Sequence, residues 1–279
     1  MKFSVGLAQC SPVSGDLAAN LDLVERIAGE ARARGADLVV FPEMMLSGSD
    51  MNRAVGTALA LDDPAFDRLA ALSREVSLCV GFIERTADFR HFIAAAYLEN
   101  GRLAHVQRKI HVVSHGSYDE GKLCGPAREV RAFDSRFGRM AIAICEDAWH
   151  YGYMLCAALD GATVILTPIA SAAAGVFAVG ESAALWEVSN RSNALRLTSW
   201  VVCVNRVGVV GERDYWGGSQ LVTPFGEVAL RGDDSAEDLY LGEIDIEAAR
   251  RARFEYPALQ IERVRDLVAN LKAIDRERL

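Results

Sequence analysis

The sequence predicts an α/β fold in which buried strands alternate with helices. Four of its apolar runs show almost no alternation with polar residues, as is typical of strands covered on both faces. These runs are 36–41, 140–144, 163–167 and 200–205. Helical spacing of apolar residues recurs elsewhere along the chain. We therefore expect layers of helix or sheet on either side of the strands.

The N-terminal part predicts strands, two helices and a hairpin. Residues 3–8 alternate as a strand, and Asp16 can cap the helix that follows it to about residue 34. A second helix over 64–76 has proline at its first position, which favours helix initiation. Asn100-Gly101 is the strongest short signal for a hairpin. The strands expected after the first apolar run are 77–83, 93–98 and 102–106.

The C-terminal part continues the pattern after a polar loop over 109–127. The run at 163–167 is expected to end at Pro168, and a helix over 181–197 follows. A long charged helix is expected from Ile261 onward. The remaining expected strands are 219–222, 228–230 and 239–244. Without a repeat or a Pro/Gly-rich linker, a single domain over 1–279 is expected, with about 247–279 as a helical extension used in packing or oligomer contacts.

Composition and charge exclude several classes of function. Hydrophobic residues make up 51% and charged residues 24% of the sequence, the profile of a globular protein. The formal charge of -8 without a basic stripe argues against nucleic acid or an anionic membrane as partner. No apolar run approaches the roughly 20 residues needed to span a bilayer. The six cysteines lack paired or metal-finger spacing, which indicates reduced thiols in the cytoplasm.

Two chemically capable side chains follow apolar runs directly, Glu43 after the first and Cys145 after the second. Because sites gather at the carboxyl ends of strands in such sheets, we expect both at one edge. A cysteine there can be a nucleophile if a cation favours its thiolate, and Lys109 is a candidate cation. Glu43, partly desolvated at its strand end, is a candidate proton carrier. The other five cysteines are expected in the core.

Three segments around these residues resemble the signature segments of the carbon-nitrogen hydrolase (nitrilase) superfamily, in the family's order. They are Phe41-Pro42-Glu43, Arg108-Lys109-Ile110-His111 and Ile144-Cys145-Glu146-Asp147-Ala148-Trp149. The separations of 66 residues from Glu43 to Lys109 and 36 from Lys109 to Cys145 are also family-like. Tyr118-Asp119-Glu120 resembles the family's loop with a second glutamate.

The resemblance implies a four-layer α-β-β-α sandwich that pairs through its helices into a homodimer or larger homo-oligomer. It also implies an amidase that works through a cysteine thioester on Cys145. Glu43 would then be the general base, and Lys109, with the backbone N–H after Cys145, would stabilise the oxyanion. Glu120 would orient Lys109 or assist proton transfer. No metal or organic cofactor is implied.

The residues after the cysteine narrow the substrate class. Nitrile-cleaving members usually have Trp-Glu there, whereas Glu146-Asp147-Ala148-Trp149 is similar to the glutaminase domains of glutamine-dependent NAD synthetases, as is Ser117-Tyr118-Asp119-Glu120. Since no synthetase domain or ATP-pyrophosphatase motif is visible, a small linear amide is favoured, for instance a carboxamide like that of glutamine. An N-carbamoyl amine or a nitrile is the alternative. The candidate substrate-binding residues are Tyr118, Glu146, Trp149 and Ser171.

Three competing interpretations remain. His111 and His115 are four residues apart, as zinc ligands on one helix face would be, but their segment is predicted as a loop. A Cys-His-Asp arrangement would use His150, the histidine nearest Cys145 in the sequence. A catalytically silent binding or assembly protein with the same fold is the non-enzymatic alternative.

Overall fold

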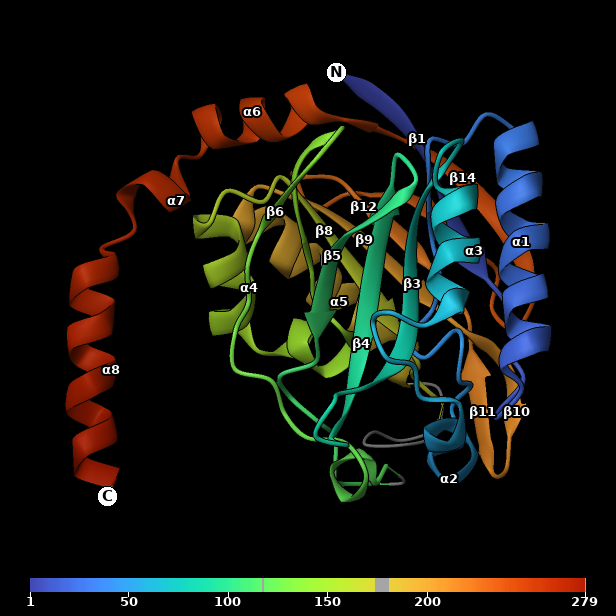
Figure 1. Ribbon diagram of the computed structural model, residues 1–279. Helices are drawn as coiled ribbons and strands as arrows, with labels where there is room; N and C mark the ends of the chain where they lie inside the picture. The colour runs from blue at the N-terminus through green and yellow to red at the C-terminus, as the bar shows by residue number, and fades with distance from the viewer. Residues whose placement is uncertain (117, 174–180, 279) are drawn as a thin grey trace.

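Two six-stranded sheets lie face to face at the centre of the chain, and helices cover their outer faces (Figure 1). The computed structural model describes residues 1–116, 118–173 and 181–278. This arrangement confirms the α-β-β-α sandwich that the family resemblance implied. Strands buried on both faces need cover on each side, which explains the apolar runs without alternation.

The first sheet combines parallel and antiparallel strands. Its order is β14 (Asp238–Asp245), β1 (Lys2–Gln9), β2 (Leu38–Val40), β3 (Ser77–Arg85), β4 (His91–Glu99) and β5 (Arg102–Arg108). β1, β2 and β3 run parallel, and the other neighbours are antiparallel. Helices α1 (Leu17–Ala33) and α3 (Pro64–Leu72) cover its outer face. Asp16 caps α1 as predicted, because its side chain accepts a hydrogen bond from the Ala19 N–H.

The second sheet has a parallel centre and antiparallel edges. Its order is β13 (Val228–Arg231), β12 (Gln220–Val222), β9 (Trp200–Asn205), β8 (Val164–Ile169), β7 (Gly138–Ile142) and β6 (Phe133–Ser135). β7, β8 and β9 run parallel, and the outer pairs are antiparallel. Helices α4 (Tyr151–Leu159) and α5 (Glu181–Leu197) cover its outer face.

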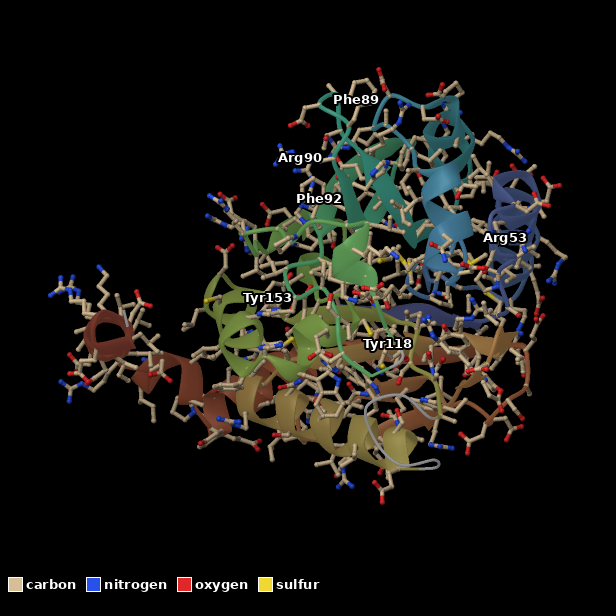
Figure 2. The ribbon with its side chains drawn as sticks, turned by 90° about the horizontal axis from the view of Figure 1, so that it is seen from below. Arg53, Phe89, Arg90, Phe92, Tyr118 and Tyr153 are labelled. Atoms are coloured by element: carbon tan, nitrogen blue, oxygen red, sulfur yellow. The ribbon has the colours of Figure 1, made fainter. Side chains whose placement is uncertain are left out.

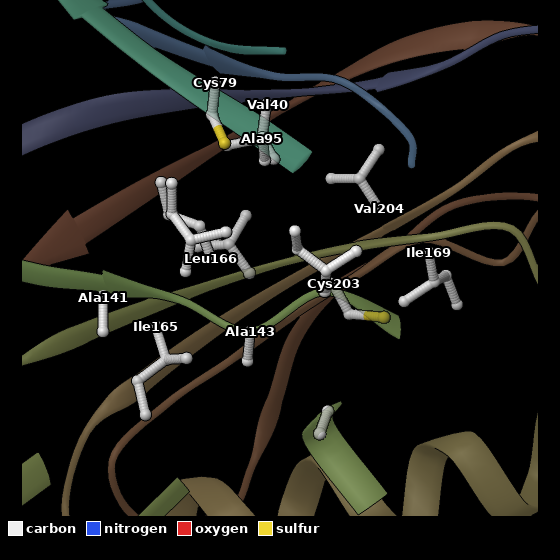
Figure 3. Close-up of a cluster of buried hydrophobic side chains, with 14 of the residues drawn as sticks. Val40, Cys79, Ala95, Ala141, Ala143, Ile165, Leu166, Ile169, Cys203 and Val204 are labelled. Atoms are coloured by element: carbon white, nitrogen blue, oxygen red, sulfur yellow. The ribbon is translucent and has the colours of Figure 1, made fainter. Parts of the chain in front are cut away.

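The core between the two sheets is built from the inward-facing side chains of both. Val40, Cys79 and Ala95 come from the first sheet, and Leu166 and Val204 come from the second (Figure 3). Ile165, next to Leu166, points the other way, toward the helices, and it too is fully buried (Figure 3). Both faces of β8 are therefore apolar, as its sequence predicted.

The predicted hairpin is confirmed. β4 and β5 pair antiparallel, and the two turn residues Asn100 and Gly101 have φ of 53° and 78°. Positive φ at both positions is what a two-residue turn of this hand requires, and Asn and Gly adopt it at low cost. A second hairpin, β10 (Val207–Val210) with β11 (Arg213–Trp216), was not predicted.

Two predicted boundaries were wrong. β8 does not end at Pro168 but continues to Ile169, with Pro168 paired to Val204 of β9. The pairing of β8 with β7 has already ended at Leu166, so the missing N–H of the proline leaves no ladder bond unmade on that side. α3 ends at Leu72 and not at residue 76, because the Ser73 hydroxyl donates to the Ala70 carbonyl and ends the helix.

The C-terminal segment is helical from Ile246 onward, close to the expected extension over about 247–279, and its long charged helix begins at Val264 where Ile261 was expected. α6 (Ile246–Glu255) buries three alanines against the sandwich, and Asp245 caps it by accepting from the Glu247 N–H. α7 (Ala258–Ile261) and α8 (Val264–Arg278) then run away from the sheets (Figure 1). α8 exposes the apolar side chains of Val264, Val268, Leu271 and Ile274. The expected pairing of chains through this extension stays a prediction, which sedimentation equilibrium of the chain tests.

Two other short elements were not predicted. α2 (Met51–Ala54) and a 3₁₀ turn over Val55–Thr57 follow the segment after β2.

Within the described part of the chain, none of the helices has both the length and the apolar character that crossing a bilayer requires.

The segment that follows β2 crosses β3 at a glycine. The Phe41 N–H donates to the Cys79 carbonyl and the Leu46 N–H to the Gly81 carbonyl, both at 2.9 Å. A Cβ on Gly81 would lie 2.5 Å from the Met44 nitrogen and 2.6 Å from the Pro42 oxygen. The backbone around Glu43 can therefore approach β3 this closely only because residue 81 has no side chain.

We expect Gly81→Ala to lower the free energy of unfolding by roughly 1–3 kcal/mol, because the new methyl group collides with backbone that cannot move freely. Chemical denaturation measures this. Gly29→Ala is the matched control, since nothing lies within 4 Å of its Cβ position on exposed α1. That control should stabilise the protein by about 0.5–1 kcal/mol through helix propensity. Equal effects of the two changes would contradict this account of Gly81.

Candidate active site

A buried lysine joins three segments that are far apart in the sequence. Lys109 follows β5 directly, and its ammonium donates to Glu43 Oε1 at 2.7 Å. The same ammonium donates to Glu120 Oε1 at 2.9 Å and Oε2 at 2.8 Å. All three side chains are buried, with 0%, 1% and 3% of Lys109, Glu43 and Glu120 exposed. One positive charge therefore sits between two carboxylates, away from bulk water.

Cys145 lies at the opening of a tight turn against this cluster. β7 ends at Ile142, and a 3₁₀ helix over Cys145–Trp149 begins three residues later. Cys145 has φ of 48°, a left-handed backbone conformation that costs a non-glycine residue about 1–3 kcal/mol. The residue is 8% exposed and lines a cavity. The turn therefore aims the thiol at the cavity and at Glu43.

The electrostatics keep the thiol protonated at rest. Burial raises the Cys145 pKa well above its ordinary value, and the Glu43 carboxylate raises it further, whereas Lys109 lowers it. For Lys109, burial lowers the pKa, but Glu120 and Glu43 outweigh burial and raise it well above the ordinary value. Lys109 is therefore a fixed cation, and attack by the sulfur requires a group that takes its proton.

Glu43 has the properties of that group. Burial raises its pKa to about 7, with the Lys109 ammonium opposing the rise and Glu120 adding to it. A hydrogen bond with the Cys145 thiol also acts on the Glu43 carboxylate and lowers its pKa. A carboxylate in contact with a thiol and with a pKa near neutrality is suited to general-base chemistry.

Glu120 closes the cluster from the loop after β5. It begins a short 3₁₀ turn over Glu120–Lys122 and accepts a hydrogen bond from the Val113 N–H at 2.9 Å. Its carboxylate also accepts two hydrogen bonds from Lys109, so it fixes residues 109–113 relative to the turn that contains Glu120. The predicted residues Glu43, Lys109, Glu120 and Cys145 are therefore brought together by the fold.

Asp147 was not predicted, and it ties the Lys109 segment to the Cys145 turn. It is fully buried and accepts from the Ile110 N–H at 3.2 Å and the His111 N–H at 2.8 Å. His111 Nδ1 lies 2.8 Å from the same oxygen. One carboxylate with several N–H partners thus fixes the distance between two catalytic-type segments. Its place within the cysteine segment, two residues after Cys145, was the available signal.

A cavity of about 170 Å³ opens beside Cys145 and Glu120. All four predicted substrate-binding residues, Tyr118, Glu146, Trp149 and Ser171, line it. Ser117, which the family comparison of the loop included, lies outside the described residues. The lining residues that were not predicted to bind substrate are Val113, His115, Ala172, Ser182 and Trp186. The sequence pattern placed Ser182 and Trp186 in the predicted helix over 181–197, but it does not show which side of that helix faces a cavity.

The Ser171 hydroxyl is the centre of a hydrogen-bond network in the cavity wall. It accepts from the indole N–H of Trp186 at 3.0 Å and of Trp216 at 3.3 Å, and it lies 3.0 Å from Ser182 Oγ. A hydroxyl has one proton and two acceptor positions. With two indole donors, Ser171 must give its proton to Ser182, so the Ser182 proton is the one left for a ligand.

His111 and His150 take no part in the cluster of Glu43, Lys109, Glu120 and Cys145. His111 stacks on His150 with ring centroids 3.5 Å apart, and His150 Nε2 lies 3.5 Å from Glu146. The charged groups that act on the Cys145 thiol are Glu43, Lys109 and Glu120. The His150 alternative therefore finds no support. The segment that contains His111 and His115 is a loop, as predicted, and no group of three or more possible metal ligands occurs among the described residues.

A larger hollow of about 490 Å³ lies elsewhere, along the β5 edge. Arg90 and Phe92 line it, and both lie far from Tyr118 of the Cys145 cavity (Figure 2). It contains no cysteine. The smaller cavity is therefore the candidate active site, because the Cys145 thiol lines it and contacts the Glu43 carboxylate.

Comparison with known proteins agrees with this geometry. The carbon-nitrogen hydrolase family model matches residues 4–254. The chain belongs to the carbon-nitrogen hydrolase family. A glutamine-dependent NAD(+) synthetase from Acinetobacter baylyi is 25% identical over 99% of this chain, and the chain spans 50% of that protein's length. An omega-amidase from Arabidopsis thaliana is 27% identical over 92% of this chain and 71% of its own.

A solved structure adds support for the fold. An amidase from Nesterenkonia sp. superposes with a TM-score of 0.81, covers 96% of each chain and is 21% identical. The family match and the amidase and nitrilase relatives together identify the chain as a carbon-nitrogen hydrolase enzyme.

We expect Asp147→Asn in this carbon-nitrogen hydrolase to lower kcat/KM by roughly 100-fold, because Lys109 and Cys145 lose their common anchor and shift relative to each other. Steady-state kinetics measures this. Asp160→Asn is the control, since Asp160 is also a carboxylate that accepts a backbone N–H, from Ala132, but its other partners are Arg131 and Arg139 and not the Lys109 segment. An Asp147→Asn enzyme with unchanged kinetics would rule out the anchoring role.

Proposed function

We propose that this carbon-nitrogen hydrolase cleaves the C–N bond of a small linear amide through a thioester on Cys145. The observation that carries the proposal is the contact of one buried carboxylate, Glu43, with both the Cys145 thiol and the Lys109 ammonium. The relatives include amidases, an omega-amidase and a probable nitrilase, which supports the reaction class.

In the first half of the reaction, Glu43 takes the thiol proton as Cys145 Sγ attacks the amide carbon. An S–C bond forms, and the carbonyl becomes an oxyanion. Glu43 then gives the proton to the amide nitrogen, the C–N bond breaks, and ammonia or an amine leaves. The pKa of Glu43, raised to about 7 by burial, allows it to accept and return a proton near neutral pH.

In the second half, Glu43 takes a proton from water, and the resulting hydroxide attacks the thioester carbon. The S–C bond breaks, the carboxylic acid leaves, and the thiolate recovers its proton from Glu43. Glu120 contributes by holding Lys109, with which it makes two hydrogen bonds. Lys109 is thereby kept charged and in one position through both halves.

The oxyanion needs donors that are ready before the reaction. The three Lys109 protons face Glu43 and Glu120, so Lys109 acts mainly through its charge at close range. The Glu146 N–H, which follows Cys145, donates to no group in the described part of the chain, and we assign the direct hydrogen bond to it. Removing one such donor typically costs roughly 100- to 1,000-fold in rate.

The substrate panel that tests this function contains linear amides, N-carbamoyl amines and nitriles, with ammonia release as the readout. We expect amides to be hydrolysed and Cys145→Ala to be slower by roughly 10,000-fold or more, because no other cysteine is among the described residues that line the cavity. Mass spectrometry of quenched wild-type reactions should show an acyl adduct on Cys145. If no compound of the panel is hydrolysed and Cys145 does not react with iodoacetamide, the result would favour a binding protein instead.

The pH profile should report the Glu43 base. For an amide without ionisable groups, kcat/KM is expected to rise with pH and level off above an apparent pKa of about 7. Glu43 is protonated below that value and cannot accept the thiol proton, whereas above it the carboxylate is present. A profile whose acidic limb lies near the ordinary value of 4.5 would contradict the assignment of Glu43 as a desolvated base.

A further inference from the structure

The charges around the Cys145 cavity are unevenly distributed. Its lining includes two glutamates, Glu120 and Glu146, but no lysine or arginine among the described residues. The Lys109 ammonium is not part of this lining, and it donates its three hydrogen bonds to the carboxylates of Glu43 and Glu120. His115 is the one basic side chain that lines the cavity in the described chain.

Arg213 approaches the cavity but is used on its far side. Its guanidinium lies 4.9 Å from the centre of the Tyr118 ring and donates to the Ser49 carbonyl. It lines a neighbouring hollow together with Asp50, Asp119 and other residues, and not the Cys145 cavity. The Arg213 guanidinium thus contacts the Tyr118 ring but is not among the residues that line the Cys145 cavity.

Glu146 presents the second carboxylate of the cavity. Glu120 is held by Lys109 and by the Val113 N–H, whereas the Glu146 carboxylate faces the His150 ring, with His150 Nε2 at 3.5 Å. The Glu146 side chain is 24% exposed, so its charge is partly desolvated. Aromatic rings share this lining, and Trp149 and Trp186 pack edge to face at 4.9 Å. A carboxylate beside aromatic faces favours a bound cation.

The neutral donors of the wall do not compensate for the missing cation. The Tyr118 hydroxyl accepts from the Ala172 N–H at 3.0 Å and lies 3.4 Å from the Ala170 oxygen. Ser171 is saturated by two indoles and Ser182, which leaves the Ser182 proton. A substrate carboxylate would lose its hydration and gain little more than this hydroxyl, close to Glu146.

We propose that the enzyme selects amides whose remote end is positively charged or neutral, and that Glu146 receives the cation. This inference rests on the proposed amidase function and adds the charge of the substrate to it. The cavity of about 170 Å³ is below the roughly 300–1,000 Å³ of sites for drug-sized ligands, so the substrate is short. Half-amides of dicarboxylic acids are rejected. Glutamine is a poor substrate as well, because its α-carboxylate finds no cation.

A matched series of short amides tests the inference. The three probes are 4-aminobutanamide, pentanamide and succinamate, which are cationic, neutral and anionic at neutral pH. We expect kcat/KM to fall in that order, with succinamate at least about 10-fold below pentanamide. In Glu146→Gln, the ratio of 4-aminobutanamide to pentanamide should fall about 10-fold and the relative rate of succinamate should rise. Glu187→Gln, a partly exposed glutamate on α5 paired with Arg191, should leave both ratios unchanged.

The outcomes separate this inference from the proposed function. A preference for succinamate, or ratios that Glu146→Gln does not change, would overturn the inference while amide hydrolysis stands. If no amide is hydrolysed, the proposed function fails. Calorimetry with Cys145→Ala protein then measures the affinities of the same three amides without turnover. Binding of succinamate as tight as that of 4-aminobutanamide would overturn the charge preference in that case too.

Discussion

The ammonium of Lys109 between two buried carboxylates is the constraint on which the site depends. Two negative charges and one positive charge are removed from water, so each must be satisfied by the others. This requirement fixes three segments relative to one another: the end of β2, the end of β5 and the turn that contains Glu120. Loss of one partner of a buried pair typically costs about 3–5 kcal/mol, so the cluster is also a structural centre.

The same constraint sets the chemistry. Because Lys109 cannot leave its carboxylates cheaply, it does not convert Cys145 to a thiolate, and the resting sulfur stays protonated. In the proposed mechanism, Glu43 removes the proton as the sulfur attacks a bound carbonyl. A neutral resting thiol is less exposed to oxidation and alkylation than a thiolate. The buried cluster therefore links reactivity to substrate binding.

Local patterns were enough to predict much of the fold. The apolar runs of β8 and β9, the Asp16 cap and the Asn100-Gly101 turn depend on residues close together in sequence, and all were confirmed. The grouping of Glu43 with Cys145 followed from a topological rule on strand ends. The roles of these residues came from the family resemblance and not from the patterns.

The missed features depend on contacts across the fold. α4 has an exposed face, formed by Gly152, Cys156 and Leu159, that carries no charged residue, so its sequence shows no polar stripe and no helical period. Asp147, Ser182 and Trp186 matter through partners in other segments, such as Ile110 and Ser171. No spacing in a single sequence records such pairs.

The left-handed backbone of Cys145 has a consequence for how this position can change over time. Glycine adopts that conformation without strain, so selection for a more stable fold alone would replace the cysteine. Only selection for the reaction opposes the replacement. A descendant chain released from catalysis is therefore expected to lose its sulfur early and to become more robust when it does, while the layers around the turn stay intact.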